Sequence, residues 1–521
     1  MSTGTVILAG GTISGTTGVL TGTSYDVRSG TISAILGGTG AALTKTTSST
    51  ATLSGDNTYT GLTTVSSTGI LVLSGNNTAA SGGVTLNTGA TLHINSATAI
   101  GTGTLTVNGG TIGNGAVGAI TLTTNNVQVW NGDFTCSIGQ NLDLGTGTVT
   151  LGNNIQILVT SNSRIFTIGG VIRDGGNGYG ITRLGTGSTP LVLAGNNTYS
   201  GLTTVSSTGV LTISGNNTAA SGGVTLNTGA TLRINSATAL GTGTLTINGG
   251  TIDNNSGSDV SVSTNNAQIW NGDFIFPGNN GLTFSSGTIT LGGNIQITST
   301  GNSRTFKIGG SIGDGGNHFS LTKAGTRSLE LSGNNTYTGL TIASAGILTL
   351  SGENTAASGG VTLNTGATLN INSATALGTG IFTINGGTIV NTATGAVTLT
   401  TNNAQVWNGD FVCSSNSGRD LDLGSGTVTL GGNIQISLSN WGRLIVGGTI
   451  QDNGHGYSLT KSGAGQGPLI LSGANTYTGS TTISSGFLEL RNANALQNST
   501  VVSSPSFAIR GKTRVFSQLS I

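Results

Sequence analysis

A long stretch of this chain recurs at a fixed spacing, and that recurrence constrains the fold more than any other feature. The stretch Leu193–Ser236 returns almost verbatim as Leu53–Ser96 and, one residue shorter, as Leu331–Ser373. Its opening appears a fourth time from Leu471, so that the tyrosines of the four copies lie about 140 residues apart. Self-similarity at a fixed period indicates stacked units that share their core with their neighbours.

We therefore expect one continuous array of repeats instead of several globular domains, although 521 residues would ordinarily form more than one domain. The array is expected to hold a partial N-terminal repeat, three long repeats and a partial C-terminal repeat. Their predicted bounds are residues 1–52, 53–192, 193–330, 331–470 and 471–521.

The composition argues against several classes of protein. Charged residues make up 6% of the chain, against about 25% in an average protein, so Thr, Ser and Asn must wet the surface. An apolar fraction of 35% with a net charge of +1 is incompatible with disorder, which needs few apolar residues and high net charge. The near-neutral balance offers no basic patch for nucleic acid, and no apolar run approaches the ~18 residues of a membrane span. We predict no nucleic-acid partner and no membrane span.

Apolar and polar residues alternate with a period of two, which is the pattern of half-buried β-strands. The strands are only three to five residues long and are broken by GG, NGG, GNN and TG turns, so none is stable alone or as a hairpin. They become stable when they stack in register along a coil. The sequence predicts an all-β fold, a single right-handed parallel β-helix with essentially no α-helix. The residues predicted to point inward are Leu226, Ile234, Leu245 and Ile247, and those predicted to be exposed are Thr225 and Arg233.

At about 22 residues per coil, the β-helix is expected to have roughly 23 coils and a length on the order of 110 Å, since parallel strands lie about 4.8 Å apart. Asparagines recur in pairs at equivalent turns and are expected to form side-chain ladders. These pairs are Asn76–Asn77, Asn216–Asn217 and Asn334–Asn335. One position that differs among the repeats holds His93, Arg233 and Asn370, and such unlike side chains indicate an exposed site.

The two cysteines occupy equivalent positions, two long repeats apart. Phe276 fills the place of Cys136 and Cys413 in the middle repeat, so the position is expected to be apolar and buried. About twelve coils separate the cysteines, a distance on the order of 60 Å, whereas a disulfide needs Cα atoms within ~7 Å. We predict two free, buried thiols.

Four segments of the chain resemble a known repeat family. Residues 459–490 read LTKSGAGQGPLILSGANTYTGSTTISSGFLEL and resemble the passenger-associated transport repeat, also called the autotransporter-associated β-strand repeat. The runs LTKAGTRSLELSGNNTYTGLT and ITRLGTGSTPLVLAGNNTYSGLTT are similar to the same pattern. The resemblance implies an exported bacterial β-helix of the autotransporter-like or adhesin-like kind, located outside the cell or on its surface.

The ends of the chain depart from that family. Autotransporters end in a membrane barrel, and the last residues, SFAIRGKTRVFSQLSI, are too few to form one. The opening MSTGTVILAGG lacks the charged and apolar regions of an export signal. We therefore expect a segment of a longer fibre, or a chain that stacks end to end through its open coils.

Two series of aspartates recur once in each long repeat and are the candidates for catalysis or metal binding. One follows a tryptophan in the sequence NGD, and the other lies in DGGNG-like loops. Carboxylates that act on polysaccharides come in clusters, often with calcium. A lone carboxylate at each position instead favours an Asx-turn. The two series are Asp133, Asp273 and Asp410, and Asp174, Asp314 and Asp452.

Basic residues also recur at two register positions. They are candidates for a groove that binds an acidic glycan, but the favoured interpretation is a solvated charge that blunts strand pairing. The histidines do not cluster with cysteines at metal-ligand spacing. We predict no catalytic residue, no cofactor-binding residue and no metal ligand. The positions concerned are Arg164, Arg304 and Arg443; Lys45, Arg183, Lys323 and Lys461; and His93, His318 and His455.

The favoured function is a non-catalytic structural or adhesive module of a bacterial surface or secreted protein. It is expected to act as a rigid stalk or fibre, with surface glycans or further copies of itself as partners. One alternative is an ice-binding β-solenoid that uses outward Thr-x-Thr pairs, and a second is a polysaccharide-active enzyme. Other segments intervene between the threonine pairs, and threonine is in any case favoured at exposed strand positions. The pairs are Thr104/Thr106, Thr148/Thr150, Thr244/Thr246 and Thr288/Thr290.

Overall fold

The computed structural model describes residues 3–160, 163–185, 187–301, 304–503 and 509–511. These residues divide into two compact units, an N-terminal unit (residues 1–256 and 262–266) and a C-terminal unit (residues 257–261 and 267–521). The described residues form strands and turns, with no helix among them. A search of the same residues finds no helix with the length and apolarity needed to cross a bilayer. Most of the terminal run SFAIRGKTRVFSQLSI lies outside the described residues.

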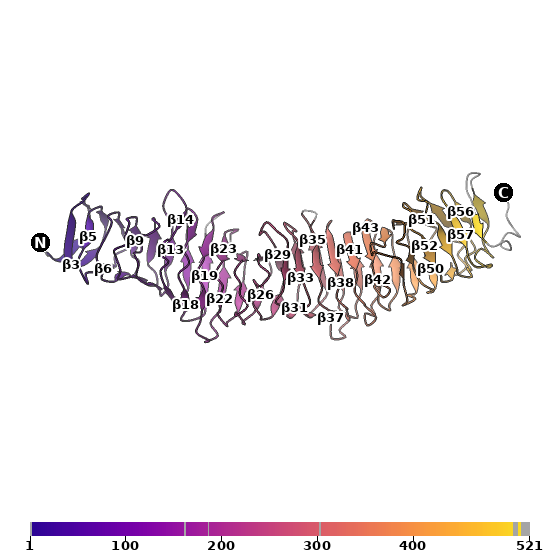
Figure 1. Cartoon of the computed structure of the whole chain (residues 1–521), viewed down its shortest axis with the longest axis horizontal. Coiled ribbons are helices and arrows are strands. Elements are labelled where there is room, and N and C mark those ends of the chain that lie inside the picture. The colour runs from indigo at the N-terminus through magenta and orange to yellow at the C-terminus, as the bar shows by residue number, and fades with distance from the viewer. Residues whose placement is uncertain (1–2, 161–162, 186, 302–303, 504–508, 512–521) are drawn as a thin grey trace. The chain divides into compact units, whose positions relative to one another are not determined.

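In the N-terminal unit the strands stack in three parallel sheets (Figure 1). The first sheet has the order β1 (Thr3–Leu8), β3 (Val19–Val27), β6 (Ala42–Lys45), β8 (Thr63–Val65), β10 (Val84–Leu86), β12 (Leu105–Val107), β15 (Gln128–Trp130), β18 (Val149–Leu151) and β21 (Ile172–Arg173), with β5 (Ile35–Gly37) beside β3. The second has the order β2 (Thr12–Ile13), β4 (Gly30–Ile32), β7 (Thr50–Leu53), β9 (Ile70–Leu73), β11 (Thr91–Ile94), β13 (Thr111–Gly113), β16 (Phe134–Cys136), β19 (Ile155–Val159), β22 (Ile181–Leu184), β24 (Thr203–Val205), β26 (Val224–Leu226) and β28 (Leu245–Ile247). The third has the order β14 (Ile120–Thr121), β17 (Leu142–Asp143), β20 (Phe166–Ile168), β23 (Pro190–Leu193), β25 (Val210–Ile213), β27 (Thr231–Ile234) and β29 (Gly250–Asp253).

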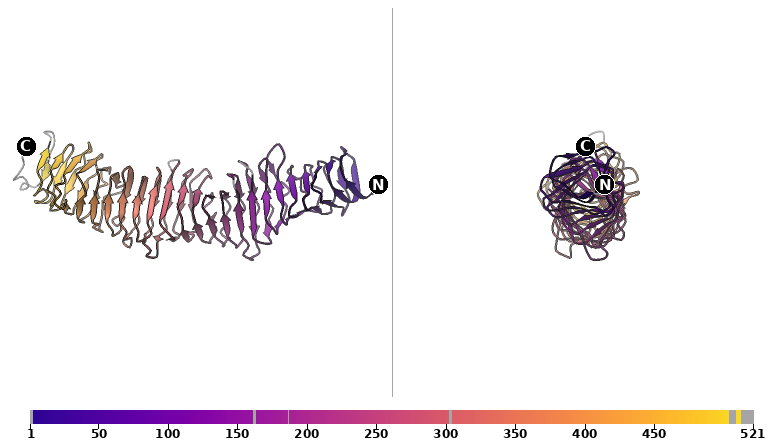
Figure 2. Two further views of the ribbon diagram at one scale, coloured as in Figure 1. Left: turned by 180° about the vertical axis from the view of Figure 1, so that it is seen from behind. Right: turned by 90° about the vertical axis from the view of Figure 1, so that its left-hand side faces the viewer.

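The C-terminal unit repeats this arrangement, and Figure 2 shows its stacked strands from behind. One run holds β31 (Gln268–Trp270), β34 (Ile289–Leu291) and β37 (Ile312–Gly313). The next holds β32 (Phe274–Phe276), β35 (Ile295–Ser299), β38 (Leu321–Ala324), β40 (Thr341–Ala343), β42 (Val361–Leu363), β44 (Phe382–Ile384), β47 (Gln405–Trp407), β50 (Val428–Leu430) and β53 (Ile450–Gln451). A third holds β33 (Leu282–Phe284), β36 (Phe306–Ile308), β39 (Ser328–Leu331), β41 (Gly346–Leu350), β43 (Ala367–Ile371), β45 (Thr388–Val390), β48 (Phe411–Cys413), β51 (Ile434–Leu438), β54 (Leu459–Ser462), β56 (Thr481–Ile483) and β58 (Val501–Ser503). The last holds β46 (Val397–Thr398), β49 (Leu421–Asp422), β52 (Leu444–Val446), β55 (Leu469–Leu471), β57 (Leu488–Leu490) and β59 (Ile509–Gly511).

Between the ends of each sheet, a strand pairs in parallel with its counterpart one coil before and one coil after it. In β10, Val84 pairs with Thr63 of β8 and with Leu105 of β12. Inward residues therefore stack on inward residues, and each fully buried Leu, Ile or Val contributes about 1.5–3 kcal/mol. The prediction of a parallel β-solenoid of about 23 turns is confirmed. So is the inward assignment of Leu226, Ile234, Leu245 and Ile247, each 0% exposed.

Close approach of successive coils requires glycine at the corners. A Cβ atom built on Gly352 would lie 1.9 Å from the carbonyl oxygen of Gly333 in the preceding coil. Gly215 stands in the same relation to Gly195, also at 1.9 Å. The GN and GG corners of the sequence therefore mark places where two backbones touch, in addition to marking turns.

Side-chain ladders run along the turns, as the asparagine pairs predict. The Oδ1 atom of Asn77 accepts hydrogen bonds from the backbone N–H of Asn57 at 2.8 Å and from its Nδ2 at 3.1 Å. Asn354 accepts the same two bonds from Asn335, at 2.9 and 3.1 Å. Each amide thereby satisfies a buried donor in the neighbouring coil, which would otherwise lower stability.

Candidate functional site

The recurrent motif of the sequence forms a recurrent internal site, and its tyrosine lies at the centre. Tyr59 is 5% exposed, and its hydroxyl is 2.7 Å from the hydroxyl of Thr63. Burial raises the pKa of Tyr59 to about 12, although the hydrogen bond to Thr63 opposes the shift. Tyr199, Tyr337 and Tyr477 make the equivalent contact with Thr203, Thr341 and Thr481. The tyrosine is therefore a neutral, satisfied core residue in every copy.

The aspartate of the DGGNG-like loop connects this loop to the tyrosine segment of the next coil. Asp174 is 2% exposed and accepts hydrogen bonds from the N–H groups of Gly176 and Gly178 at 3.0 and 2.8 Å. It also accepts one from the hydroxyl of Ser200, beside Tyr199, at 2.7 Å. Burial opposes ionisation of Asp174, but these hydrogen bonds outweigh it and hold the pKa below its ordinary value. The predicted Asx-turn is confirmed.

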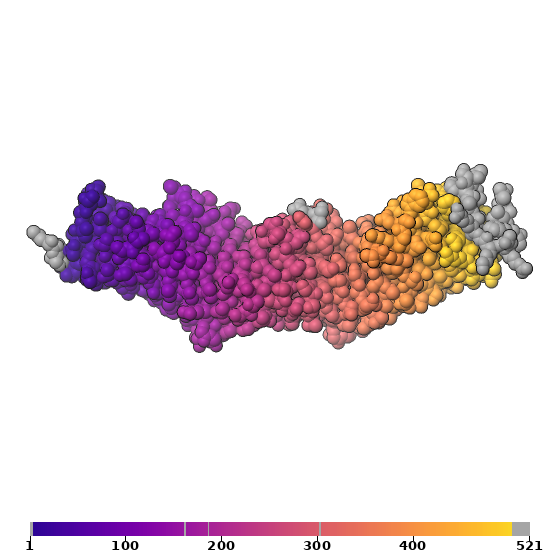
Figure 3. Space-filling view, viewed as in Figure 1, coloured from indigo at the N-terminus to yellow at the C-terminus, as the bar shows by residue number. Residues whose placement is uncertain are grey.

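Asp314 and Asp452 repeat the arrangement in the C-terminal unit. Asp452 accepts hydrogen bonds from the N–H and the hydroxyl of Thr478, at 3.0 and 2.8 Å. Burial disfavours its ionised form, but donors from Thr478, Gly454 and Gly456 bring the pKa to about 2. The Asp314 loop follows β37 and forms a small projection on the surface of its unit (Figure 3).

The basic residues of the same motif are buried, and the prediction that they are solvated charges is wrong. Lys45, Arg183, Lys323 and Lys461 are 0–1% exposed. The reason is register: in β38, Leu321 and Lys323 are two positions apart and point to the same inner side of the coil. Lys323 Nζ donates to the carbonyl oxygens of Ala324, Gly325 and Ala345 at 2.7, 2.9 and 3.0 Å. Backbone carbonyls take the place of a carboxylate partner.

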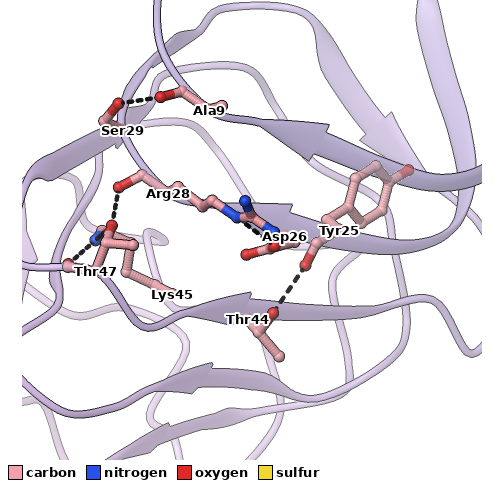
Figure 4. A network of polar contacts seen from close by, with 8 residues as sticks. All are labelled: Ala9, Tyr25, Asp26, Arg28, Ser29, Thr44, Lys45 and Thr47. Carbon is pink, nitrogen blue, oxygen red and sulfur yellow. Dashed lines mark hydrogen bonds and ion pairs between the residues drawn. The ribbon is translucent and has the colours of Figure 1, made fainter.

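Figure 4 shows the first member of this series. Lys45 Nζ donates to the hydroxyl of Thr47 at 2.9 Å and to its carbonyl oxygen, and the Thr47 hydroxyl donates to the carbonyl of Arg28. Asp26 lies nearby and forms an ion pair with Arg28 at 2.7 Å. Burial lowers the pKa of Lys45, and the negative charge of Asp26 partly opposes that shift. The pKa of Lys323 falls to about 8 because burial disfavours its charged form.

The cavities beside the tyrosines are too small for a substrate. Equivalent cavities adjoin Tyr59, Tyr199 and Tyr337, and each has a volume of about 10 Å³. That is the space of about one water molecule, whereas small-molecule sites usually measure about 300–1,000 Å³. The recurrent site is thus built to join coils.

The comparison with known proteins agrees with this geometry. The model of the passenger-associated-transport-repeat matches residues 43–67, 185–207, 321–348 and 459–490. The chain carries four passenger-associated-transport repeats. Each match contains one of the four buried tyrosines. The first, third and fourth also contain the buried lysine. In the second copy Arg183 takes the place of the lysine, and it lies just before the match begins at residue 185.

One curated relative is an autotransporter adhesin, described as "Adhesin BmaC autotransporter" of Brucella suis biovar 1 (strain 1330). It is 36% identical over 221 residues, which are 40% of this chain and 6% of that protein. The chain therefore corresponds to a small part of the relative's length. No solved structure matches the chain.

Outside the passenger-associated-transport repeats, the NGD aspartates connect coils through their side chains. Asp133, Asp273 and Asp410 each accept the backbone N–H of a glutamine one coil further on, at 2.7 Å. Among the described residues, no three His, Cys, Asp or Glu side chains lie close enough together to hold a metal ion.

The two cysteines are buried, whereas two of the three histidines are exposed. Cys136 and Cys413 are free and buried, as predicted, and Phe276 is buried at the equivalent place. Burial raises the pKa of Cys413 to about 11, although hydrogen bonds from Ser415 lower it. His318 and His455 are exposed in loops.

The position shared by His93, Arg233 and Asn370 is half-buried, so the prediction of an exposed site is wrong there. The reason is that these side chains lie against a neighbouring coil, which for Asn370 is the preceding one, where its Nδ2 donates to the hydroxyl of Thr349 at 2.9 Å. Arg233 Nε is 3.6 Å from Asp253, its register partner in β29. The register partner of His93 is Gly113 in β13, and a Cβ atom built on Gly113 would lie 2.7 Å from Nδ1 of His93. Thr225, also predicted to be exposed, is likewise half-buried.

The Thr-x-Thr pairs do not occupy consecutive coils. Thr106 in β12 and Thr150 in β18 are separated by β15, where Val129 holds the outward place. Val127, which precedes β15, is 50% exposed. The exposed arginines behave as predicted: Arg304 and Arg443 approach Asp259 and Asp420 at 3.6 and 3.8 Å on the surface, and Arg164 is also exposed.

Sequence reasoning missed one residue on the surface. Trp130, Trp270 and Trp407 are 0% exposed and pack edge-on against Phe134, Phe274 and Phe411. Trp441 is 63% exposed, in the loop between β51 and β52. The signal was present in the sequence, because the buried tryptophans precede NGD whereas Trp441 stands in SNWGR.

Proposed function

We propose that this chain is a non-catalytic structural and adhesive module of a bacterial surface or secreted autotransporter-like protein. The observation that carries the proposal is the recurrence of the passenger-associated-transport repeat on a parallel solenoid, together with similarity to part of an adhesin autotransporter. The module acts as a stalk that presents its outward loops, outside the cell or on its surface.

The internal chemistry supports a structural role for the recurrent site. Its tyrosine, aspartate and lysine are all buried, and their polar atoms contact protein groups of the same or the next coil. The contacts that join two coils, such as Ser200 to Asp174 and Lys323 to Ala345, hold one coil on the next, because an unpaired buried polar group costs about 1–3 kcal/mol. No reacting group in this set is offered to solvent.

The outer surface supports a binding role. With 6% charged residues and a net charge of +1, it does not attract ligands through a general electrostatic field. Recognition then depends on hydroxyl, amide and aromatic side chains in the loops. Such side chains suit saccharides and protein surfaces, the usual ligands of proteins displayed outside cells.

The test is an adhesion assay on the whole chain. Beads coated with the folded chain are applied to cultured animal cells, and beads coated with the heat-unfolded chain serve as the control. We expect at least tenfold more attached beads with the folded chain, and no shortening of soluble polysaccharides incubated with it. Equal attachment of the two kinds of bead would contradict the adhesive role. Polysaccharide cleavage that is lost in an Asp133→Ala or Asp174→Ala variant would contradict the non-catalytic role.

The alternative of ice binding is weakened by the interruption at β15, since an ice-binding face needs outward threonine pairs in consecutive coils. An assay of ice recrystallisation decides this alternative independently of adhesion. We expect the chain to leave ice-crystal growth unchanged.

A further inference from the structure

Three loops of the C-terminal unit stack on one another around Trp441. They are residues 414–420 between β48 and β49, residues 439–443 between β51 and β52, and residues 463–468 between β54 and β55. We call them the Trp441 loop surface. Figure 1 labels β51 and β52, the strands on either side of the Trp441 loop, toward the C-terminal end of the chain. Trp441 is the only large apolar side chain in these described loops that is exposed.

The backbone on both sides of Trp441 is held firmly. The N–H of Gly442 donates to the carbonyl of Ser415 in the preceding coil at 2.8 Å. The carbonyl of Asn440 accepts the N–H of Gly467 in the following coil at 3.2 Å. The Nδ2 of Asn440 also donates to the carbonyl and hydroxyl of Ser414, at 3.1 and 3.0 Å. The indole is therefore attached to an ordered loop, which lowers the entropy lost when a ligand binds.

The polar groups around Trp441 have a positive excess. Arg419 and Arg443 lie in these loops with Asp420 as the single carboxylate. The Arg443 side chain is 53% exposed and its Nε is 3.8 Å from Asp420. The contact of the Arg419 guanidinium within the described part of the chain is a long one, 3.5 Å to the carbonyl of Thr392. Both guanidinium groups thus retain donors for a carboxylate, which arginine binds in bidentate fashion.

The remaining exposed side chains of the surface are polar except for the methyl group of Ala464, and Pro468 is half-buried. Asn416, Ser417 and Gln466 are exposed, and none of them adds apolar area. A protein partner needs an interface of about 1,200–2,000 Å² with an apolar centre, which one tryptophan among amides and hydroxyls does not provide. A pyranose ring fits better, because its C–H face stacks on an indole while its hydroxyls bond to amides and hydroxyls.

We propose that the Trp441 loop surface is a binding site for an acidic saccharide, a glycan that contains uronate or sialate residues. The sugar ring stacks on Trp441, and the carboxylate of the ligand accepts hydrogen bonds from Arg419 and Arg443. This inference deepens the proposed adhesive function and rests on it. It assigns the ligand class and the residues, neither of which follows from the repeat.

The test measures binding of the whole chain to immobilised oligogalacturonate, with a neutral galacto-oligosaccharide of the same length as the control ligand. We expect the wild-type chain to bind the acidic oligosaccharide at least tenfold more tightly than the neutral one. Trp441→Ala should weaken binding at least tenfold, and Arg443→Gln at least threefold, with a smaller dependence of affinity on salt. The matched control is Ile381→Ala, which removes another exposed apolar side chain (52% exposed) of the same unit.

Each outcome decides between the site and the broader function. Unchanged binding by Trp441→Ala, or equal binding of acidic and neutral saccharides, would overturn the site. If bead adhesion to cells survives in Trp441→Ala while oligogalacturonate binding is absent in all forms, the adhesive function stands and this site does not. If Trp441→Ala abolishes adhesion even to cells stripped of glycans, the partner is a protein and the saccharide assignment is wrong. Circular dichroism of each variant checks that the solenoid is intact.

Discussion

At the scale of single residues, the buried cation is the least expected feature of the chain. Lys323 is 1% exposed and has carbonyl partners but no ion pair among the described residues. A charged group taken out of water is destabilising unless hydrogen bonds compensate, and the native state then favours the neutral amine. Three carbonyl acceptors reduce that penalty without removing it, which is why the pKa of Lys323 lies at about 8 and not at 10.5.

The lowered pKa of Lys323 makes stability depend on pH in a definite direction. Between about pH 8 and 10.5 the unfolded chain holds a proton that the folded chain has released, so the free energy of unfolding rises with pH. Substitution Lys323→Met removes this titration. From pH 7 to 9.5, we expect the wild type to gain about 2 kcal/mol relative to the variant, measured by chemical denaturation at each pH.

The comparison with Lys323→Arg separates titration from loss of the side chain. Arginine occupies the equivalent place as Arg183, where burial lowers the pKa to about 10, so it remains largely charged up to pH 9.5. In Lys323→Arg, as in Lys323→Met, the free energy of unfolding should therefore lack the rise between pH 7 and 9.5 that Lys323 causes in the wild type. The buried tyrosines lower stability above about pH 10, but they do so in all three proteins. Parallel curves for the three proteins would show that Lys323 does not titrate in this range.

At the scale of the coil, the corners decide how closely one turn approaches the next. The 1.9 Å between a Cβ on Gly352 and the carbonyl oxygen of Gly333 is far inside van der Waals contact. The oxygen belongs to the backbone and the position of a Cβ is fixed by its own backbone, so neither atom can rotate away and the two coils must separate. Separation would also disturb β40 and β42, the strands that follow Gly333 and Gly352, because they pair across the same two coils.

We therefore expect Gly352→Ala to lower the free energy of unfolding by about 3 kcal/mol or more. The matched control is Gly432→Ala in the same unit, because a Cβ there meets no heavy atom within 4 Å. That variant should change stability by less than about 1 kcal/mol, and in either direction. Denaturant midpoints of the two variants give the comparison, and similar losses in both would refute the close-contact explanation.

At the scale of the whole molecule, most of the fold was predictable because one physical rule repeats in every coil. Alternation of apolar and polar residues correctly assigned Leu226 and Ile247 to the interior, and the recurrence of the long stretch indicated a stacked array. Lys461 was misplaced because its charge was given more weight than its period, although Leu459, Thr460 and Lys461 alternate as a strand does. Trp441 was missed because a loop side chain obeys neither period nor repeat.

Stability in such a molecule is expected to be local, since a strand such as β41 pairs only with β39 in the coil before it and with β43 in the coil after it. Gly352→Ala should therefore speed up amide hydrogen exchange in β39, β41 and β43. The increase in exchange rate should disappear within a few coils of the substitution. The amides of β10 and β12, in the N-terminal unit, should keep their wild-type protection. Hydrogen exchange read by mass spectrometry, peptide by peptide, measures both regions in one experiment. A uniform loss of protection in both units would mean that the chain unfolds as one cooperative body, against the nearest-neighbour view of its repeats.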